Sequence, residues 1–551
     1  MATEQGVSIP GYEEFVTGFS LEKAAAELLN GDLEKGINAC VECCDRHVGQ
    51  NRVALTCIGQ DGREERYTFE QLQKWSAQFA NLLKQRGIGP GDRVAGLLPR
   101  KLELMIVVLG AWRAGAIYQP LFTAFGPQSI EHRLHGSEAR LVVTDSANRV
   151  KLRQGAHASR TLVVGDDAEA AENFHAQLRA QPDQFQPVMR KGSDPFQMLF
   201  TSGTTGKAKG VMVPLKALVA FGVYMRYAVG LREDDRMWNI ADPGWAYGLY
   251  YAITGPLLLG HETMFYEGSF TVESTYRIIR ERRINNLLGA PTAYRMLMAA
   301  GPEAARRVKG QLRVVSSAGE PLNPEVIRWF AEHLDVVVHD HYGQTETGMT
   351  ICNHHDLKHP LHLGAAGYAL PGYRAAIIDA DGRELTAGTP GLLALDMSQS
   401  PLFFFPGYWR QAEQPFRRQY YPTGDTAELN EDGSISFVGR SDDVITSSGY
   451  RIGPFDVESS LIEHPSVAEV AVVGKPDPER TEIVKAFVVL RQGIESSDTL
   501  AEELALFVKQ RLAAHAYPRE IEFVNELPKT PSGKIQRFLL RTQGGQAKAA
   551  L

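Results

Sequence analysis

The sequence predicts an α/β protein of several folding units, built largely on parallel sheets. Helical and strand patterns alternate from Tyr67 onward, and a charged turn near residue 440 separates a smaller α/β tail from the rest of the chain. At 551 residues the chain is longer than one hydrophobic core usually serves, so about three to four units are expected. Ligands of such folds bind beyond the carboxyl ends of the strands.

The first predicted helix and strand lie between residues 68 and 98. Thr68 and Gln71 match a capping box, and Gly87 offers a stop before the apolar run 94–98. Apolar residues repeat at helical spacing between them, at Leu72, Trp75, Phe79, Leu82 and Leu83. The same alternation continues through residues 102–112, 116–118, the segment beginning at Pro127, and 141–144. This order predicts a parallel sheet with crossover helices.

The charged turn from Gly439 to Asp443 is the predicted domain boundary. It separates a strand-like segment from a tail with apolar runs at 470–473 and 487–490 and a helical pattern near 500–512. We therefore divide the chain into a large domain (1–439), a hinge (440–443) and a small C-terminal domain (444–551).

The composition is that of an ordinary globular protein, with 44% hydrophobic and 22% charged residues. The formal net charge of −7 gives no broad positive surface, so we expect neither a nucleic-acid partner nor binding to anionic lipid. The N-terminus has no basic segment followed by an apolar run, and no stretch approaches the ~20 apolar residues of a membrane span. These features predict a cytoplasmic protein without stable membrane insertion.

Two groups of cysteine and histidine residues raise the question of a metal site. The first consists of Cys40, Cys43, Cys44 and His47. Residues 37–47 predict one amphipathic helix, in which cysteines pack as small hydrophobes, and no second cysteine pair would complete a tetrahedral site. The second consists of Cys352, His354, His355, His359 and His362, without HExxH-type spacing. Core packing is favoured over metal binding in the first group, and metal binding is not favoured in the second.

Residues 198–210, MLFTSGTTGKAKG, predict a strand followed by a phosphate-binding loop. Glycines let backbone N–H groups converge on an anion, hydroxyls add donors and lysines add charge. The candidate residues are Thr201, Ser202, Gly203, Thr204, Thr205, Gly206 and Lys207. The Walker A pattern does not fit, because the glycine spacing is shorter and Ala208 stands where Ser or Thr would hold magnesium. A flexible surface turn is the alternative, and a P-loop kinase or ATPase is not favoured.

Four further motifs accompany this loop: SSAGEPLNPE from Ser316, DHYGQTETG from Asp340, YPTGDTAEL from Tyr421 with GRSDDVITSSGYRIGP from Gly439, and PKTPSGKIQR from Pro528. In this order and at these intervals, the motifs resemble those of the adenylate-forming superfamily, which includes acyl-CoA synthetases, luciferases and nonribosomal adenylation domains. The resemblance spans nearly the whole chain and is greatest to acetyl/propionyl- and medium-chain acyl-CoA synthetases. It implies a large domain of two α/β subdomains plus a small β-barrel, followed by a small mobile α/β domain.

The resemblance implies an AMP-forming carboxylate–CoA ligase of fatty acid metabolism. Such an enzyme uses ATP and Mg²⁺ to convert a carboxylic acid to an acyl adenylate with release of pyrophosphate, then transfers the acyl group to coenzyme A. The acetate branch is switched off by acetylation of its catalytic lysine. A lysine acetyltransferase or deacetylase acting on Lys534 is therefore an expected kind of partner.

The nucleotide site is expected on three motifs. Tyr342 offers an aromatic face for adenine, and Glu346 is a hard oxygen ligand for Mg²⁺. Asp425 can accept both ribose hydroxyls, and the resemblance adds Arg440 as a second nucleotide contact. The remaining candidates are Asp340, His341, Gly343, Gln344 and Thr345, with Gly319, Glu320 and Pro321 as the opposite wall of the adenine slot. The alternatives are a core tyrosine, a solvated carboxylate and a turn-forming aspartate.

Lys534 is the expected catalytic residue. Its ammonium can bridge two anions, the attacking carboxylate and the α-phosphate, in the transition state of adenylation. The resemblance implies that Arg451 meets the ATP phosphates and that the small domain rotates about Asp442, presenting first Lys534 and then a coenzyme A channel lined by Gly449. Arg133 is a weaker candidate for the nucleotide end of coenzyme A, because a helical arginine is commonly solvated.

The acyl pocket is expected to be larger than one for acetate. Gly343 stands where the acetate branch carries tryptophan, and Ala246 and Ala318 stand where that branch has larger aliphatic residues. Trp245 and Tyr247 flank Ala246 in the sequence, and Tyr247 could close the pocket at an acyl chain of intermediate length. These features favour a short- to medium-chain, branched or aryl acid.

Three alternatives remain open. The chain could be an acetate or propionate–CoA ligase, or an adenylating enzyme that loads a carrier protein or oxidises a luciferin. From a different class, it could be a nonenzymatic binder of AMP-like ligands or acyl-CoA. The presence of Lys534, Glu346 and Asp425 argues against an inactive scaffold.

Overall fold

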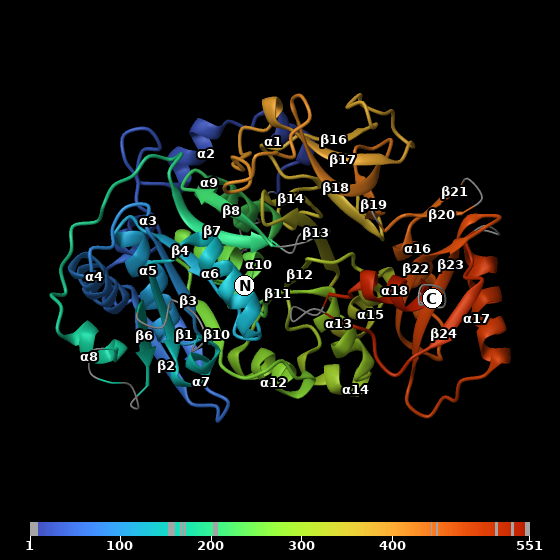
Figure 1. Cartoon of the computed structure of the whole chain (residues 1–551), viewed down its shortest axis with the longest axis horizontal. Coiled ribbons are helices and arrows are strands. Elements are labelled where there is room, and N and C mark those ends of the chain that lie inside the picture. Colours follow the sequence, from blue (N-terminus) through green and yellow to red (C-terminus); the bar gives the residue numbers. More distant parts are fainter. Residues whose placement is uncertain are drawn as a thin grey trace, which may run out of the picture.

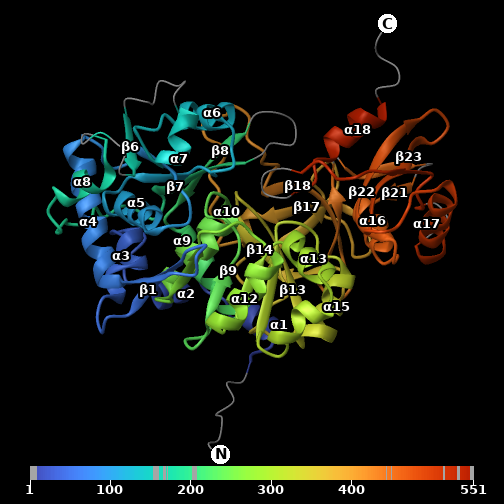
Figure 2. The same ribbon diagram turned by 90° about the horizontal axis from the view of Figure 1, so that it is seen from below.

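The computed structural model describes residues 9–152, 160–165, 169, 172–201, 208–441, 443–447, 450–512, 516–529 and 534–545. Its elements gather into a large α/β body and a smaller C-terminal group. Figures 1 and 2 both place the C-terminal strands and helices at one end of the molecule, beside α15 (Pro324–Leu334) and β19 (Ile435–Arg440) and far from α4 (Phe69–Gln85). This arrangement matches the predicted α/β class with a small C-terminal unit.

A six-stranded sheet carries the predicted phosphate loop. Its order is β6-β5-β3-β4-β7-β8, and every neighbouring pair is parallel except β7 and β8. The strands are β3 (Arg93–Leu97), β4 (Ile117–Pro120), β5 (Leu141–Asp145), β6 (Thr161–Val164), β7 (Pro195–Thr201) and β8 (Lys209–Pro214). The crossover helices include α5 (Leu102–Arg113) and α6 (Pro127–Ser137). The helix and strand alternation predicted for residues 68–144 is confirmed.

The predicted capping box begins α4. The Thr68 hydroxyl accepts the N–H of Gln71 at 3.3 Å, and the Gln71 side-chain oxygen accepts the N–H of Thr68 at 2.9 Å. Gly87, just beyond the helix, has φ of +67°, a left-handed conformation that favours glycine. Leu72, Phe79 and Leu82 are buried beneath the helix, so the apolar spacing identifies the face that packs on the core.

A ten-stranded sheet joins the middle of the chain to the YPTGDTAEL motif, which contains Asp425. Its order is β16-β17-β18-β19-β15-β14-β13-β12-β11-β9. The parallel strands are β9 (Met237–Asn239), β11 (Asn286–Gly289), β12 (Val314–Ala318) and β13 (Val338–Gln344). The antiparallel strands are β14 (Gly348–Cys352), β15 (Ala365–Ala369), β16 (Ala375–Ile378), β17 (Gly391–Asp396), β18 (Tyr420–Leu429) and β19. Among the described residues these antiparallel strands continue the parallel ones in one sheet. The small β-barrel implied by the resemblance is therefore not seen as a separate sheet there.

A third sheet in the large body joins the N-terminal part of the chain to its middle. It has the order β10-β1-β2, and β1 pairs in parallel with β10. Its strands are β1 (Val53–Ile58), β2 (Glu64–Thr68) and β10 (Thr263–Tyr266). Nearby helices of the middle segment include α12 (Val272–Arg282) and α13 (Pro291–Ala299).

The C-terminal elements form a five-stranded sheet with its own core. The strands are β20 (Ile445–Ser447), β21 (Tyr450–Ile452), β22 (Val467–Asp477), β23 (Thr481–Leu490) and β24 (Glu520–Phe523). The helices are α16 (Pro454–Ile462), α17 (Asp498–Arg511) and α18 (Arg537–Gly545). Val457, Val472 and Leu504 belong to a buried cluster confined to this unit. The chain passes from the ten-stranded sheet to this one between Arg440 and Ile445, at the predicted charged turn.

The N-terminal cysteines lie in the core, but the prediction of one amphipathic helix there is wrong. The α-helix is limited to α3 (Ala39–Cys43) and is followed by a 3₁₀ turn at Asp45–His47. All five cysteines of the chain are buried and free. Glu42 is fully buried and accepts the N–H groups of Asn30 and Gly31. Within α3, Val41 alone is partly exposed, so this helix has no polar face toward solvent.

Within the described residues, no helix combines the length and apolar character required to cross a bilayer.

Candidate active site

The phosphate loop connects the two antiparallel strands β7 and β8. Thr201 lies opposite Lys209 in their register. Six of the candidate phosphate-binding residues lie outside the described residues: Ser202, Gly203, Thr204, Thr205, Gly206 and Lys207. The Lys209 ammonium is 4.9 Å from the centre of the Tyr408 ring, and the Tyr408 hydroxyl donates to Glu346 Oε1 at 2.7 Å. The base of the loop is therefore joined to the predicted magnesium ligand through one tyrosine.

Glu346 presents a buried carboxylate at this junction. Its residue exposure is 7%, and burial raises the pKa of the carboxyl, while the Tyr408 hydrogen bond opposes that rise. A single anionic oxygen suits Mg²⁺, which usually takes one or two protein carboxylates and completes its shell with phosphates and water. The described residues contain no cluster of three or more His, Cys, Asp or Glu that could hold a metal by itself. The donor set thus fits an ion that arrives with a nucleotide.

Asp425 lies at the centre of a second polar cluster. Its Oδ2 accepts the Tyr342 hydroxyl at 2.5 Å and the Gln344 amide at 3.2 Å, and Arg440 is 3.6 Å from Oδ1. Burial raises the pKa of this carboxyl, whereas Arg440 and, more weakly, the Lys534 ammonium lower it. The C-terminal lysine is therefore within electrostatic reach of the predicted ribose carboxylate.

The DHYGQTETG motif occupies the end of β13, but its side chains point to different environments. Asp340 accepts the N–H of Leu322 at 3.3 Å, and burial raises its pKa to about 8. The His341 ring contacts the Tyr224 hydroxyl at 2.8 Å and the Asn353 carbonyl at 3.1 Å. Since both ring nitrogens are occupied inside the core, His341 can offer a nucleotide only its backbone. The Thr345 carbonyl accepts the hydroxyl of a buried tyrosine, Tyr250.

Gly343 sits at an irregularity of the β13–β14 register. A Cβ on this residue would lie 2.2 Å from the Gly348 carbonyl oxygen and 2.6 Å from Met349 Cα. These are backbone atoms, so no side-chain rotation would relieve the clash. The glycine is needed for the close approach of two strands, a reason that the sequence comparison with acetate enzymes did not reveal.

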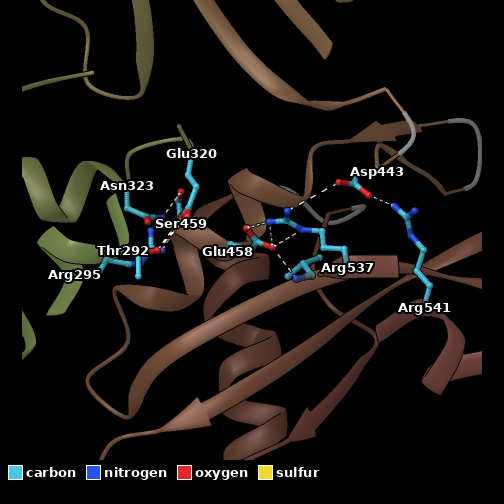
Figure 3. Close-up of polar contacts among 10 residues, drawn as sticks. Thr292, Arg295, Glu320, Asn323, Asp443, Glu458, Ser459, Arg537 and Arg541 are labelled. Carbon is cyan, nitrogen blue, oxygen red and sulfur yellow. Dashed lines mark hydrogen bonds and ion pairs between the residues drawn. The ribbon is translucent and has the colours of Figure 1, made fainter. Parts of the chain in front are cut away.

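The predicted adenine wall follows β12. Gly319 has φ of +102°, which favours glycine, and Pro321 is partly exposed. The Glu320 carboxylate is held by the Thr292 hydroxyl at 3.1 Å and by Arg295 at 2.9 Å (Figure 3). This carboxylate is thus turned toward α13.

The predicted acyl-pocket residues lie at the end of β12 and at the start of α10 (Ala246–Gly248). Ala318 is buried at the end of β12, and Trp245, Ala246 and Tyr247 are each partly exposed. The Trp245 ring packs against Phe122 and Phe125, while the Tyr247 ring meets Tyr251 at 5.6 Å. Trp245 and Tyr247 therefore belong to two different aromatic clusters.

Of the two residues expected to bind coenzyme A, Arg133 and Gly449, the structure describes only Arg133. The Arg133 guanidinium does not extend into solvent as expected for a helical arginine: the residue is 8% exposed, and the guanidinium lies 4.1 Å from the centre of the Phe125 ring. Gly449 and Asp442 lie outside the described residues. For Arg451 only the backbone is described, opposite Thr446 in β20.

The small unit contacts the large body beside the predicted adenine wall. Asn323 donates to the Ser459 hydroxyl at 3.0 Å, and Arg328 pairs with Glu463 at 2.6 Å (Figure 3 shows the first contact). These contacts join α16 of the small unit to α15 of the large body, and the Lys534 charge lowers the pKa of the Asp425 carboxyl.

Sequence reasoning missed Tyr408, Tyr224 and Arg537. Tyr408 lies in an aromatic stretch without a recognisable motif, and Tyr224 lies outside the motifs, in an apolar stretch after the phosphate loop. Arg537 does stand in the PKTPSGKIQR motif, only three positions after Lys534, and its place there was an available signal.

Comparison with known proteins identifies the family. Residues 44–409 match the model of the AMP-binding enzyme, and residues 456–534 match the model of the AMP-binding enzyme C-terminal domain. The chain belongs to the AMP-binding enzyme family. These matches agree with the five motifs, which lie within or beside the two matched segments.

Similar proteins from this family include acid–CoA ligases. The acetyl-coenzyme A synthetase of Bacillus subtilis is 40% identical over 98% of this chain and 96% of its own length. A crystal structure of a Brucella canis acyl-CoA synthetase is 59% identical, with a TM-score of 0.80 over 97% of this chain and 99% of that one. A structure of the anthranilate CoA ligase AuaEII with anthranoyl-AMP is 27% identical, with a TM-score of 0.86 over 96% and 99%. The predicted family, fold class and enzyme class, an AMP-forming acid–CoA ligase, are confirmed.

Proposed function

We propose that this AMP-binding enzyme joins a short- to medium-chain, branched or aryl acid, larger than acetate, to coenzyme A. In the first step the acid's carboxylate oxygen attacks the α-phosphorus of ATP, and the bond to pyrophosphate breaks. In the second step the thiol sulfur of coenzyme A attacks the acyl carbon, and AMP leaves as the acyl–oxygen bond breaks.

One arrangement supports the assignment of the first step: the small unit that carries Lys534 contacts the large body through Asn323–Ser459 and Arg328–Glu463, and the Lys534 charge lowers the pKa of the Asp425 carboxyl. If Asp425 holds the ribose, a cation near this carboxylate is also close to the phosphate attached to the same ribose. A preorganised cation there relieves the repulsion between the incoming carboxylate and the phosphate. Bound Mg²⁺ would neutralise phosphate charge, with Glu346 as its protein ligand.

The side chains around the acyl site support an acid larger than acetate. Ala246 and Ala318 are smaller than the aliphatic residues of the acetate branch at these positions, and each methylene of the acid buried beside them would contribute roughly 0.8 kcal/mol to binding. Tyr247 and Trp245 supply aromatic walls. The 40% identity to a protein named acetyl-coenzyme A synthetase favours the second candidate, an acetate or propionate ligase.

A substrate panel tests the proposal. Acids from acetate to decanoate, with branched and aromatic acids, are incubated with ATP and Mg²⁺, with and without coenzyme A, and AMP, pyrophosphate and acyl-CoA are measured. We expect AMP and pyrophosphate in equal amounts and the highest kcat/KM for an acid larger than propionate. Formation of ADP and orthophosphate would overturn the mechanism, and highest activity with acetate would favour the second candidate. Acylation of a carrier protein but not of free coenzyme A would change the acceptor.

A pocket-narrowing variant sharpens the same test. Ala246→Val adds two methyl groups at a partly exposed wall, so kcat/KM should fall for longer acids and fall less for acetate, by about 10-fold in their ratio. Equal changes for all acids would remove Ala246 from the pocket.

A further inference from the structure

The segment that carries Lys534 is closed at its base and continues directly into α18. The N–H of Gln536 donates to the Pro528 carbonyl at 2.8 Å, and Lys529 and Ile535 form an antiparallel bridge. Helix α18 begins at Arg537. The position of this helix therefore determines where the catalytic lysine is presented.

Arg537 anchors the start of α18 to the interior of the small unit. Its Nη2 lies 2.8 Å from both carboxylate oxygens of Glu458, and its Nε is 3.3 Å from Oε1 (Figure 3). Glu458 is only 6% exposed and also accepts the N–H of Val472 at 2.8 Å. One carboxylate thus ties α18 to α16 and β22 by charge-assisted hydrogen bonds.

The same arginine reaches the chain segment that links the two units. Its Nη1 is 4.0 Å from Asp443 Oδ2, and Arg541, one helical turn further along α18, pairs with Asp443 Oδ1 (Figure 3). Asp443 follows directly on the predicted hinge residue Asp442. Two arginines on one face of α18 therefore hold the end of the link.

The charge of Arg537 is also influenced by a carboxylate of the large body. Burial disfavours its charge, but the Glu458, Asp443 and Glu320 carboxylates raise the pKa of the guanidinium. Glu320 belongs to the predicted adenine wall. The positive charge of Arg537 is therefore stabilised by carboxylates from the core of the small unit, the link and the predicted adenine wall.

We propose that Arg537 is a positioning residue for adenylation, which fixes the Lys534 segment to the link between the two units through Glu458 and Asp443. This inference rests on the proposed role of Lys534. A displacement of about 1 Å at a reacting group can lower a rate by about 100-fold, so a lost anchor three positions from Lys534 should be visible in the first half-reaction. The second half-reaction does not require Lys534 at the phosphate and should be spared.

The test separates the two half-reactions in the full-length protein. Arg537→Gln removes the charge and keeps a side chain of similar length. Adenylation is followed as acid-dependent pyrophosphate release without coenzyme A, and thioester formation is followed from supplied acyl adenylate. We expect adenylation kcat to fall by about 10-fold to 100-fold with little change in thioester formation or in KM for ATP.

Three further variants control for a purely structural effect. Arg537→Lys keeps a charge but cannot bind both Glu458 oxygens and Asp443, so it should restore only part of the rate. Asp443→Asn weakens the link while leaving the buried Arg537–Glu458 pair, which provides a test if Arg537→Gln does not fold. Arg491→Gln removes a positive charge elsewhere in the small unit, where Arg491 Nε donates to the Val467 carbonyl at 3.1 Å, and should leave both rates unchanged.

Each outcome decides the inference. A selective loss of adenylation in Arg537→Gln and Asp443→Asn supports it. Equal loss of both half-reactions, or no loss, overturns it while leaving the ligase function intact. If the unaltered protein makes no acyl adenylate from any acid, the proposed function itself fails, and the two failures are thereby distinguished.

Discussion

At the scale of single residues, Lys534 should separate the two chemical steps. Lys534→Ala removes the cation that we propose acts on the α-phosphate, and whose charge lowers the pKa of the Asp425 carboxyl. By analogy with loss of one preorganised donor, adenylation should slow by at least about 100-fold to 1000-fold, because the developing charge at phosphorus loses its partner. Thioester formation from supplied acyl adenylate should continue at nearly its normal rate. Both rates are measured by rapid quench with radiolabelled acid.

A neighbouring lysine provides the matched control. Lys529 lies in the same segment and pairs with Glu469 at 2.6 Å, within the small unit. Lys529→Ala should retain much more adenylation activity than Lys534→Ala. Equal losses in the two variants, or equal loss of both half-reactions in Lys534→Ala, would count against a direct role for the Lys534 ammonium.

Gly343 should not tolerate the tryptophan that the acetate branch carries at this position. The expected Cβ clashes with backbone atoms of Gly348 and Met349, so even Gly343→Ala forces β13 and β14 apart. Such overpacking typically costs about 1–3 kcal/mol of unfolding free energy. We expect Gly343→Ala to lower the Tm and Gly343→Trp to lose activity with every acid, without a shift toward acetate.

Gly89→Ala is the control for this substitution. An added Cβ at Gly89 meets no atom within 4 Å, so its Tm should stay close to that of the unaltered protein. A stable Gly343→Trp enzyme with improved acetate activity would show that the glycine acts by opening the pocket.

At the scale of elements, the sequence predicts most accurately the segments whose signals are local. The capping box at Thr68, the stop at Gly87 and the apolar spacing between them define α4 almost to the residue. The strand and helix order up to β5 follows from the same periodicity. These features depend on neighbours within about one or two helical turns, so the chain alone contains the information.

The site is predicted less evenly because it depends on contacts between distant segments. Motifs locate Asp425, Tyr342 and Gln344, but only side-chain contacts between β13 and β18, which are not neighbours in the sheet, bring all three into one hydrogen-bonded cluster. Residues 37–47 illustrate an error of this kind: their spacing predicts one amphipathic helix, whereas backbone donors 11 and 12 residues away hold the Glu42 carboxylate in the core. Local sequence patterns therefore indicate candidate site residues. Contacts between distant segments determine which of their side chains are accessible to a ligand.

At the scale of the whole molecule, buried histidines should make stability sensitive to acid. Burial lowers the pKa of His339 to about 4 and that of His341 to about 3, and the His339 ring stacks on His355 at 3.8 Å. Below pH 6.5 the unfolded chain protonates these rings and the folded protein does not, so stability present above pH 6.5 is lost as the pH falls toward 4. For His339 alone the loss at pH 5 is about 2 kcal/mol.

The raised pKa of Asp340 has the opposite effect, because ionisation of this carboxyl lowers the stability of the fold as the pH rises toward 8. Comparison of variants separates the His339 contribution from such carboxyl effects. His339→Gln should lose about 2 kcal/mol less than the unaltered protein between pH 7.5 and pH 5, by urea unfolding. His135→Gln, at an exposed position, should show the unaltered pH dependence. Equal pH dependence in all three proteins would exclude His339 as an acid-sensitive group.

The resemblance implies a rotation between the two units, which substitution of Asp442 would test. The contacts Asn323–Ser459 and Arg328–Glu463 belong to the arrangement in which the Lys534 charge lowers the pKa of the Asp425 carboxyl, and the implied rotation should break them. Proline at Asp442 fixes φ near −65° and so opposes a hinge that has to change φ and ψ. We expect Asp442→Pro to retain one half-reaction and to lose at least about 10-fold in the other, whereas Asp442→Ala, which removes the carboxylate but leaves the backbone free, should retain both. Normal rates for both half-reactions in Asp442→Pro would place the hinge elsewhere in the chain.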